Sequence, residues 1–285
     1  MKTPMIRFEN FSWQYNAQAE PTLRNIDLTV YEGEKILICG PSGCGKSTLA
    51  HCLNGLIPFS YRGTMEGSLT ICGKTAADLS IFDISKIVGT VLQDADGQFV
   101  GLTVAEDIAF ALENDRIPQE EMRRRVKAAA EEVDIADHLL HAPNELSGGQ
   151  KQRVSLAGVL VDDVPILLFD EPLANLDPAT GKQAIELIDE IHRKKNATVI
   201  IIEHRLEDVL WRDVDRIILM SDGRITADMT PDALLCSDLL QQGGIREPLY
   251  LSALKLAGVT VTADMMPHSL RTLQLSDAQK QQVRD

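Results

Sequence analysis

The stretch GPSGCGKST, from Gly40 to Thr48, combines residue types that bind phosphate. It fits the pattern G-x-x-x-x-G-K-[ST], follows a strand-like run and precedes a helical stretch that begins at Lys46. Its glycines let the backbone curl so that N–H groups and the helix N-terminus face a β-phosphate. We expect Lys46 to reach the β- and γ-phosphates and the Ser47 hydroxyl to ligate Mg²⁺. The predicted binding residues are Gly40, Pro41, Ser42, Gly43, Cys44, Gly45, Lys46, Ser47 and Thr48.

Two carboxylates end the apolar run ILLFDEP, namely Asp170 and Glu171. If the run is a strand of a doubly wound sheet, both side chains lie at the carboxyl edge, beside the phosphate loop. Asp170 then suits an outer-shell partner of Mg²⁺, and Glu171 suits a base for an attacking water. Two acidic residues at a strand end can also simply begin a helix, but the phosphate loop argues strongly against that alternative.

A second glycine-rich turn, LSGGQ, heads another helical stretch about a hundred residues after the first. Ser147 and the N–H groups of Gly148 and Gly149 form a second potential anion site there. A self-contained monomer with one complete phosphate loop leaves this second site without a role.

The elements that must position these motifs alternate along the chain. Helical stretches separate strand-like apolar runs at 35–40, 87–93, 165–172, 198–204 and 216–221, which predicts a largely parallel sheet with helices on its faces. Between Gln93 and Pro165 the chain becomes charged and helical, which predicts an inserted helical subdomain at about 94–165. The DG pair at 222–223 predicts a hairpin. We expect one domain over 3–230 and a small helical extension over 231–285, which carries no chemical motif.

Composition restricts the function classes. The chain has 285 residues and a net charge of −14, which argues against a broad basic surface for nucleic acid. Neither a signal-peptide pattern nor an apolar run of about 18 residues is present, so we expect a cytosolic chain. The five cysteines include no C-x-x-C pair, and their odd count predicts buried thiols rather than a disulfide framework.

The phosphate loop, LSGGQ, the Asp-Glu strand end and a later His204 stand in the order found in ATP-binding-cassette (ABC) ATPases, which residues 3–230 resemble. The resemblance implies a P-loop α/β fold with a mainly parallel sheet, an antiparallel β-subdomain and the helical insert. It also implies ATP and Mg²⁺. In that family the signature residues cap the γ-phosphate held by a second subunit, arranged head to tail; here they are Leu146, Ser147, Gly148, Gly149 and Gln150.

Further roles follow from the resemblance one residue at a time. Tyr15 matches the aromatic that stacks on adenine, with a core aromatic as the alternative, and Trp13 is expected to pack. Gln93 resembles the glutamine that senses Mg²⁺ and links the two subdomains. Asp177 resembles an acidic residue that crosses the dimer interface, and His204 resembles the histidine that reaches the γ-phosphate. We interpret the remaining histidines as structural or surface residues; they are His51, His138, His141, His192 and His268.

The branch of the family is indicated by QDADGQFVGLTVAEDIAFALEN and by SLAGVLVDDVPILLFDEP, where Gly158 replaces a common arginine. Both resemble energy-coupling-factor ATPases, which drive vitamin and metal-ion importers. The segment IREPLYLSALKLAGVTV is similar to the middle of tandem versions that carry two ATPase halves. The chain is therefore expected to be a separate subunit or one half of such a protein.

The resemblance implies two kinds of partner: a second ABC ATPase subunit, identical or related, and an integral membrane transport subunit. It places the chain peripherally at the cytoplasmic face of the membrane and implies no nucleic acid. We expect the membrane subunit to bind near Gln93–Phe110. There Phe99, Val100 and Leu102 either form the floor of a groove or pack under the insert.

Two rival functions use the same cassette. A DNA-repair or chromosome ATPase carries coiled-coil or zinc inserts, and a ribosome-acting factor carries two cassettes with a basic linker. Neither feature is present in the sequence.

Overall fold

The computed structural model describes residues 2–92, 96–174 and 176–284. Its larger sheet has six strands in the order β10-β9-β3-β8-β7-β6, in which β10 runs antiparallel to β9 and the other neighbours are parallel. The strands β3, β7 and β8 are buried along their whole length, as expected for apolar runs covered on both faces. The parallel sheet and the β9–β10 hairpin confirm the sequence predictions. Their bounds are Lys35–Cys39 (β3), Val88–Val91 (β6), Ile166–Asp170 (β7), Thr198–Ile202 (β8), Arg216–Ser221 (β9) and Arg224–Met229 (β10).

A smaller antiparallel sheet has the order β2-β1-β4-β5. Its apolar side chains share one core with Ile36 and Ile38 of β3 and with Leu49 of α1. Trp13 belongs to this core and is 1% exposed, so its predicted packing role is confirmed. The bounds are Pro4–Tyr15 (β1), Leu23–Tyr31 (β2), Gly63–Ile71 (β4) and Lys74–Thr75 (β5).

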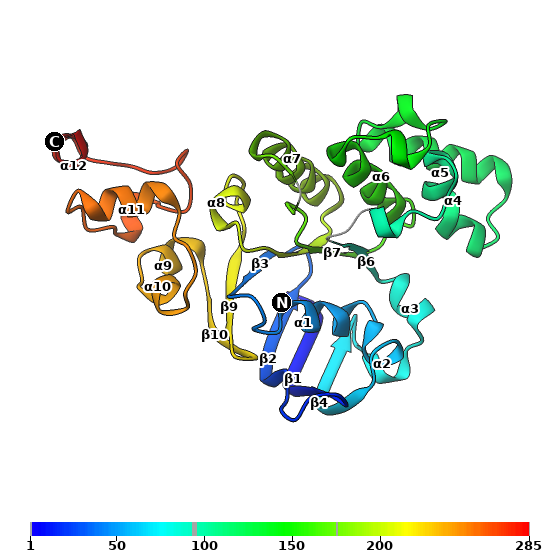
Figure 1. Cartoon of the computed structure of the whole chain (residues 1–285), viewed down its shortest axis with the longest axis horizontal. Coiled ribbons are helices and arrows are strands. Elements are labelled where there is room, and N and C mark those ends of the chain that lie inside the picture. The colour runs from blue at the N-terminus through cyan, green and yellow to red at the C-terminus, as the bar shows by residue number, and fades with distance from the viewer. Residues whose placement is uncertain (1, 93–95, 175, 285) are drawn as a thin grey trace.

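The helical insert lies at one end of the molecule (Figure 1). Its first long helix begins after Thr103, whose side chain forms a capping box with Glu106, at the position expected from the sequence. The three main helices pack through buried residues such as Ile108, Val126 and Val154, which belong to the core on the other face of the parallel sheet. They are α4 (Val104–Asn114), α5 (Gln119–Glu132) and α6 (Gly148–Leu160).

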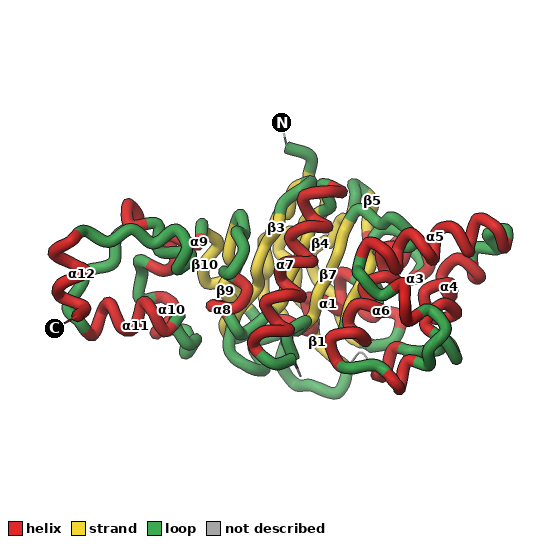
Figure 2. Tube along the Cα trace, turned by 90° about the horizontal axis from the view of Figure 1, so that it is seen from above, coloured by secondary structure: helices red, strands yellow, loops and turns green. Residues whose placement is uncertain are grey.

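The remaining helices connect or cover the strands. The long α7 lies against the parallel sheet between the insert and the carboxyl-terminal segment (Figure 2). These helices are α1 (Lys46–Leu53), α2 (Leu56–Phe59), α3 (Ile81–Ser85), α7 (Pro178–Lys195) and α8 (Leu206–Val209). Short 3₁₀ turns cover Ala76–Asp78, Asp96–Gln98, Ala136–His138, Pro143–Glu145 and Ala263–Met265. None of the helices in the described ranges is long and apolar enough to cross a membrane.

The carboxyl-terminal segment lies at the end of the molecule opposite the insert, in both views (Figures 1 and 2). Leu234, Leu235 and Leu251 are buried in the same core as the parallel sheet, so the segment packs onto the cassette. Arg271 also lies over the ring of Trp211, 3.6 Å from its centroid. The division into domains at residue 230 stays a prediction. The helices are α9 (Pro231–Leu235), α10 (Leu239–Gln242), α11 (Leu249–Leu256) and α12 (Asp277–Arg284).

Candidate active site

The phosphate loop connects β3 to α1 at the carboxyl edge of the parallel sheet. Gly43 and Gly45 have φ values of +80° and +106°, a left-handed conformation that glycine adopts without strain. The Lys46 ammonium is buried and donates hydrogen bonds to the carbonyl oxygens of Gly40 at 2.9 Å and Pro41 at 3.1 Å. The cation therefore lies inside the loop. Because the first N–H groups of a helix have no partner in it, the loop offers a cradle for phosphate oxygens.

Asp170 ends β7 and is 7% exposed. Burial, together with the nearby Glu171 and Glu203, raises the pKa of Asp170 to about 6, and Lys46 opposes this shift. One of its oxygens, Oδ1, is buried without a hydrogen-bond partner among the described residues. Such an oxygen, with the exposed Ser47 at the start of α1, fits a hard cation.

The residues at the carboxyl edge of the sheet fit Mg²⁺ better than a metal ion that is coordinated by protein side chains alone. Within the described part of the chain, no group of three or more His, Cys, Asp or Glu side chains could hold a metal ion. Mg²⁺ needs no such cage, because it is commonly bound by one or two carboxylates together with substrate phosphates. Ser47 and Asp170 are thus suited to hold it.

Glu171 occupies a constrained backbone position directly after β7. Its φ of +51° is left-handed, which costs a non-glycine residue about 1–3 kcal/mol and is typical of functional sites. Its N–H group donates to the Ile202 carbonyl oxygen at 2.9 Å, and its own carbonyl oxygen accepts from the N–H group of Ala174 at 3.0 Å. The carboxylate is half-buried. The sheet therefore holds a candidate base at its carboxyl edge.

His204 follows β8, the strand between β7 and β3. Its side chain is 59% exposed, and Nδ1 lies 3.1 Å from Oε1 of Glu203. Glu203 itself is fully buried, and the sequence reasoning did not single it out. Its one sequence signal was an acidic residue ending an otherwise apolar run. The loops after β3, β7 and β8 thus bring the phosphate loop, Glu171 and His204 to one edge of the sheet.

Tyr15 also lies next to the phosphate-loop helix. Its hydroxyl is 3.1 Å from the Thr48 hydroxyl, and its ring makes edge-to-face contacts with Trp13 and Tyr61, with centroids 5.8 and 6.0 Å away. Desolvation raises the pKa of Tyr15. Tyr61, 43% exposed, stacks on His51 at 4.8 Å. Tyr15 is half-buried and close to the loop, which is compatible with a core aromatic and with an aromatic that stacks on adenine. Adenine stacking therefore stays a prediction.

The LSGGQ segment forms the N-terminus of α6 in the helical insert. The Ser147 N–H donates to Oε1 of Gln150 at 2.9 Å, and the Ser147 hydroxyl accepts from the Gln150 N–H at 3.4 Å. Leu146 is buried beneath the cap, whereas Ser147 and Gly148 are exposed. Because these two residues are exposed and the first turn of α6 contains no acidic residue, this helix N-terminus can accept an anionic ligand from outside.

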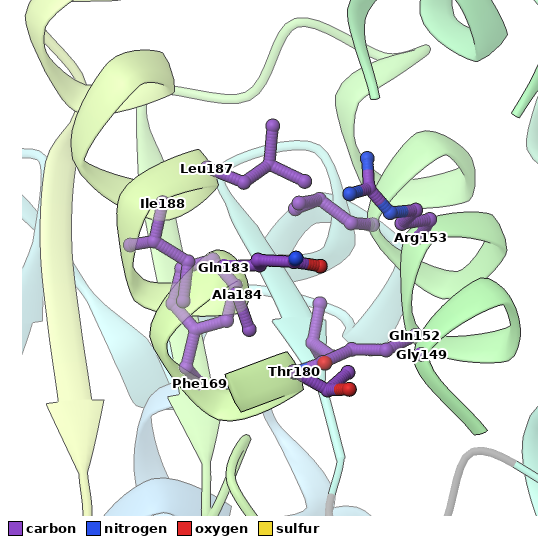
Figure 3. A pocket seen from close by; sticks show the side chains of 11 residues that line it. Gly149, Gln152, Arg153, Phe169, Thr180, Gln183, Ala184, Leu187 and Ile188 are labelled. Carbon is purple, nitrogen blue, oxygen red and sulfur yellow. The ribbon is translucent and has the colours of Figure 1, made fainter. Parts of the chain in front are cut away.

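A small cavity separates this helix from α7 (Figure 3). Gly149 faces Thr180 across it, and a Cβ at Gly149 would lie only 2.7 Å from the Thr180 methyl carbon. At Gly148 the nearest atom to such a Cβ is 3.9 Å away, in Leu176. The two glycines therefore differ: Gly149 is needed for packing within the chain, and Gly148 is not.

Asp177 caps α7. Its carboxylate accepts hydrogen bonds from the N–H groups of Ala179 at 2.9 Å and Thr180 at 3.1 Å and from the Thr180 hydroxyl, and these bonds lower its pKa. The residue is exposed, so a contact across an interface is compatible with this cap and stays a prediction. Gln93, predicted to bind both nucleotide and metal, lies outside the described residues.

A groove of about 690 Å³ opens beside the edge strand β6, between α3, α4 and the end of α6. Its lining includes the exposed side chains of Ile81, Phe82 and Phe110. Gly158 also lines it, and no atom lies within 4 Å of where its Cβ would be, so the missing side chain keeps the groove open. Lys86 and Asp162 also line the groove and form an ion pair, and Lys86 pairs with Asp115 as well.

The groove lies near the predicted stretch but not on the predicted residues. Phe110, the last residue of that stretch, and Leu92, directly before its first residue, line it. Phe99 instead packs against the main core, and Val100 and Leu102 are 62% and 82% exposed. These three residues do not line the groove beside β6, whose floor is built by β6 and the helices around it, and their contact with a membrane partner stays a prediction.

Comparisons with known proteins place these features in a family. Residues 23–174 match a family described as ABC transporter, and residues 237–285 match one described as ATP-binding cassette cobalt transporter. An ABC transporter ATP-binding protein of Enterococcus faecalis is 61% identical over 92% of this chain, and one of Photobacterium profundum is 62% identical over 95%. The aligned regions cover 46% and 48% of those proteins, so the chain spans about half the length of the curated relatives it matches.

Solved structures agree. The structure of cbiO1 from Clostridium perfringens, part of the ABC transporter complex cbiONQ, has a TM-score of 0.76 and 28% identity over 89% of this chain and all of that one. The bacterial ABC transporter cassette MJ0796, solved as a dimer, has a TM-score of 0.68 and 30% identity over 79% of this chain and 98% of that one. The same cassette has also been solved with ADP and Pi after hydrolysis.

Proposed function

The chain belongs to the family of ABC transporter ATPases, and on this premise we propose that it is the ATP-hydrolysing motor subunit of an energy-coupling-factor type importer. The observation that carries the proposal is the convergence of the phosphate loop, Asp170, Glu171 and His204 at the carboxyl edge of β3, β7 and β8.

Each residue has a part in hydrolysis. The phosphate-loop N–H groups and Lys46 bind the phosphates of ATP, and Tyr15 stacks on its base. Ser47, Asp170 and Gln93 would hold Mg²⁺, which would supply positive charge to offset that of the phosphates. Glu171 accepts a proton from the attacking water, and His204 contacts the γ-phosphate.

A second subunit completes the site. The LSGGQ turn lies on the insert, and its exposed Ser147 and Gly148 face outward at an open helix N-terminus. That N-terminus is suited to cap the γ-phosphate on a facing subunit, while Asp177 contacts that subunit. Closure around two ATP molecules follows because each nucleotide is bound from both sides. The dimeric structure of MJ0796 supports this arrangement. The partner is a second copy or a related ATPase half.

The membrane subunit docks in the groove beside β6. An amphipathic helix is the occupant that fits, because apolar side chains such as Phe82 and Phe110 line the groove while the Lys86 ion pairs mark a polar wall. The groove is lined by β6, which pairs with β7, the strand that ends in Asp170, so docking and hydrolysis involve neighbouring strands of one sheet. The relative cbiO1 belongs to a transporter complex, which supports a peripheral position at the cytoplasmic face of the membrane.

The transported substrate is a metal ion or a vitamin. The match of residues 237–285 to a family described as cobalt transporter favours a metal ion. An ABC ATPase acting on DNA or ribosomes is the rival, and the net charge of −14 argues against it. Co-purification separates the two. The proposal predicts membrane proteins with the chain and ATP hydrolysis lost on Glu171→Gln, whereas co-purifying nucleic acid and no membrane protein would contradict it.

A further inference from the structure

Glu203, directly before His204, is fully buried, and its carboxylate accepts hydrogen bonds from three main-chain N–H groups. Oε1 of Glu203 accepts hydrogen bonds from the N–H groups of His204 at 2.8 Å and Arg205 at 3.1 Å. Oε2 accepts from the N–H group of Leu173 at 3.2 Å. A buried carboxylate is tolerated when such bonds replace its hydration. Glu203 therefore ties the loop after β8 to the turn that follows Glu171.

Arg205, directly after His204, binds the carbonyl oxygens of the same turn, at Leu173 and Leu176. Nη1 of Arg205 donates to the carbonyl oxygens of Leu173 at 3.0 Å and Leu176 at 3.3 Å. The guanidinium is itself fixed, because Nε donates to Oδ2 of Asp208 at 2.7 Å. Leu173 thus has its N–H bound by Glu203 and its carbonyl bound by Arg205.

The clamped turn lies between two residues of the candidate site. Glu171 stands two positions before Leu173, and Asp177 directly follows Leu176. Glu203 also lies 3.1 Å from Nδ1 of His204. A carboxylate oxygen this close to Nδ1 restricts the ring and leaves Nε2 for a second partner. One carboxylate therefore contacts both the histidine ring and the turn of the base.

We propose that Glu203 and Arg205 are positioning residues that fix His204 relative to Glu171 and Asp177. The proposal rests on the proposed function, because it assigns them to the same ATP site. Neither side chain touches substrate. Their effect is to hold the histidine at the γ-phosphate and the carboxylate at the water in one geometry, and a displacement of about 1 Å can lower a rate about a hundredfold.

The test begins with Glu203→Gln in the full chain. An amide has one acceptor oxygen and an NH₂ group that is itself a donor, so it cannot accept from all three N–H groups. We expect kcat to fall by about ten- to a hundredfold, with ATP affinity changed by less than about threefold. Glu34→Gln is the matched control. Glu34 is 5% exposed and accepts from the Tyr31 N–H at 3.0 Å, but it precedes β3, at the opposite edge of the sheet.

Two further measurements separate positioning from general stability. Because Glu203 acts partly through the histidine, Glu203→Gln should lower kcat less in a His204→Ala background than in the unsubstituted chain. Amide hydrogen exchange at Leu173 and Leu176 should be faster in Glu203→Gln and in Arg205→Lys, because lysine lacks the guanidinium fork, and unchanged in Glu34→Gln.

The outcomes distinguish this proposal from the proposed function. Wild-type kcat for Glu203→Gln, in a protein whose Glu171→Gln counterpart is inactive, would overturn the positioning role alone. So would unchanged amide exchange at Leu173, or a full additional loss in the His204→Ala background. Wild-type turnover of Glu171→Gln would instead contradict the assignment of Glu171 as the base. Amide exchange would still decide whether Glu203 and Arg205 hold the turn at Leu173 and Leu176.

Discussion

The N–H group of Glu171 donates a hydrogen bond of 2.9 Å to the carbonyl oxygen of Ile202, and thereby joins the residue after β7 to the end of β8. Because the bond uses only the main chain, Glu171→Gln keeps it and changes the carboxylate alone. We expect the variant to bind ATP normally, to hydrolyse it about a hundredfold or more slowly, and to accumulate as a closed dimer. Single-turnover kinetics and size-exclusion chromatography with ATP check this. Near-normal turnover would remove Glu171 from its role.

Lys46→Ala should act on binding rather than on the chemical step. The ammonium lies inside the loop, bonded to the Gly40 and Pro41 carbonyls, where a phosphate can take over its hydrogen bonds. Loss of a charged hydrogen bond predicts nucleotide affinity about 10- to 100-fold weaker, measured by calorimetry. Lys74→Ala, at an exposed site in β5, is the control and should bind normally. Equal affinity of the two variants would contradict the assignment.

Asp170 predicts a pH dependence of stability in the metal-free protein. Its pKa in the folded state is about 6, above the ordinary 3.8, so the folded protein holds this proton more tightly than the unfolded one. The free energy of unfolding should therefore fall as pH rises from about 4 to about 6 and then level off, by at most about 3 kcal/mol from this group. Asp170→Asn should flatten that slope in urea unfolding measured across this range. An unchanged slope in Asp170→Asn would show that the pKa of Asp170 is not raised in the folded state.

Gly148→Ala separates the composite site from packing. A Cβ at Gly148 has room, and alanine favours a helix, so the free energy of unfolding should stay the same or rise by up to about 1 kcal/mol. ATPase activity that increases with protein concentration should nevertheless be lost, because the methyl group meets the nucleotide of the facing subunit. Gly149→Ala is a poor substitute, because its Cβ would meet Thr180 within the chain. Full activity of a well-folded Gly148→Ala would contradict the assignment of this turn.

The groove beside β6 predicts which surface change uncouples the membrane partner. Phe110→Asp should abolish co-purification with the membrane subunit while the chain folds, binds ATP and dimerises, since Phe110 is 48% exposed and lines the groove. Leu102→Asp, at an 82% exposed residue outside the groove, should leave the complex intact. Loss of the complex with Leu102→Asp but not with Phe110→Asp would contradict docking in the groove and would place the docking surface near Leu102. Phe99→Asp should lower stability instead, because Phe99 packs on the core.

The chemistry could be predicted where it depends on contiguous residues. The phosphate loop, the Asp170-Glu171 strand end and the Thr103 start of α4 each combine a local pattern with a local geometry, and the structure has them at the expected places on strand ends and helix starts. The parallel sheet followed from apolar runs that are buried on both faces.

The features that could not be predicted from the sequence depend on packing between segments that are distant along the chain. Glu203 reaches Leu173 across 30 positions, and nothing in the spacing of an acidic residue before a histidine reveals that contact. The groove gathers residues from α3, β6, α4 and α6, which are far apart in the sequence, so no local apolar pattern predicted it. The capping hydrogen bonds of Asp177 were equally hidden, although its proline neighbour marked a helix start.

The most direct test of the composite ATP site mixes two defective variants under conditions in which the unsubstituted chain is active. In a head-to-tail pair, Lys46 of one subunit and Gly148 of the other belong to the same site. A Lys46→Ala subunit paired with a Gly148→Ala subunit therefore carries both defects in one site and none in the other. We predict that the mixture hydrolyses ATP well above the sum of the two separate variants. A mixture no more active than that sum would contradict a site shared between subunits.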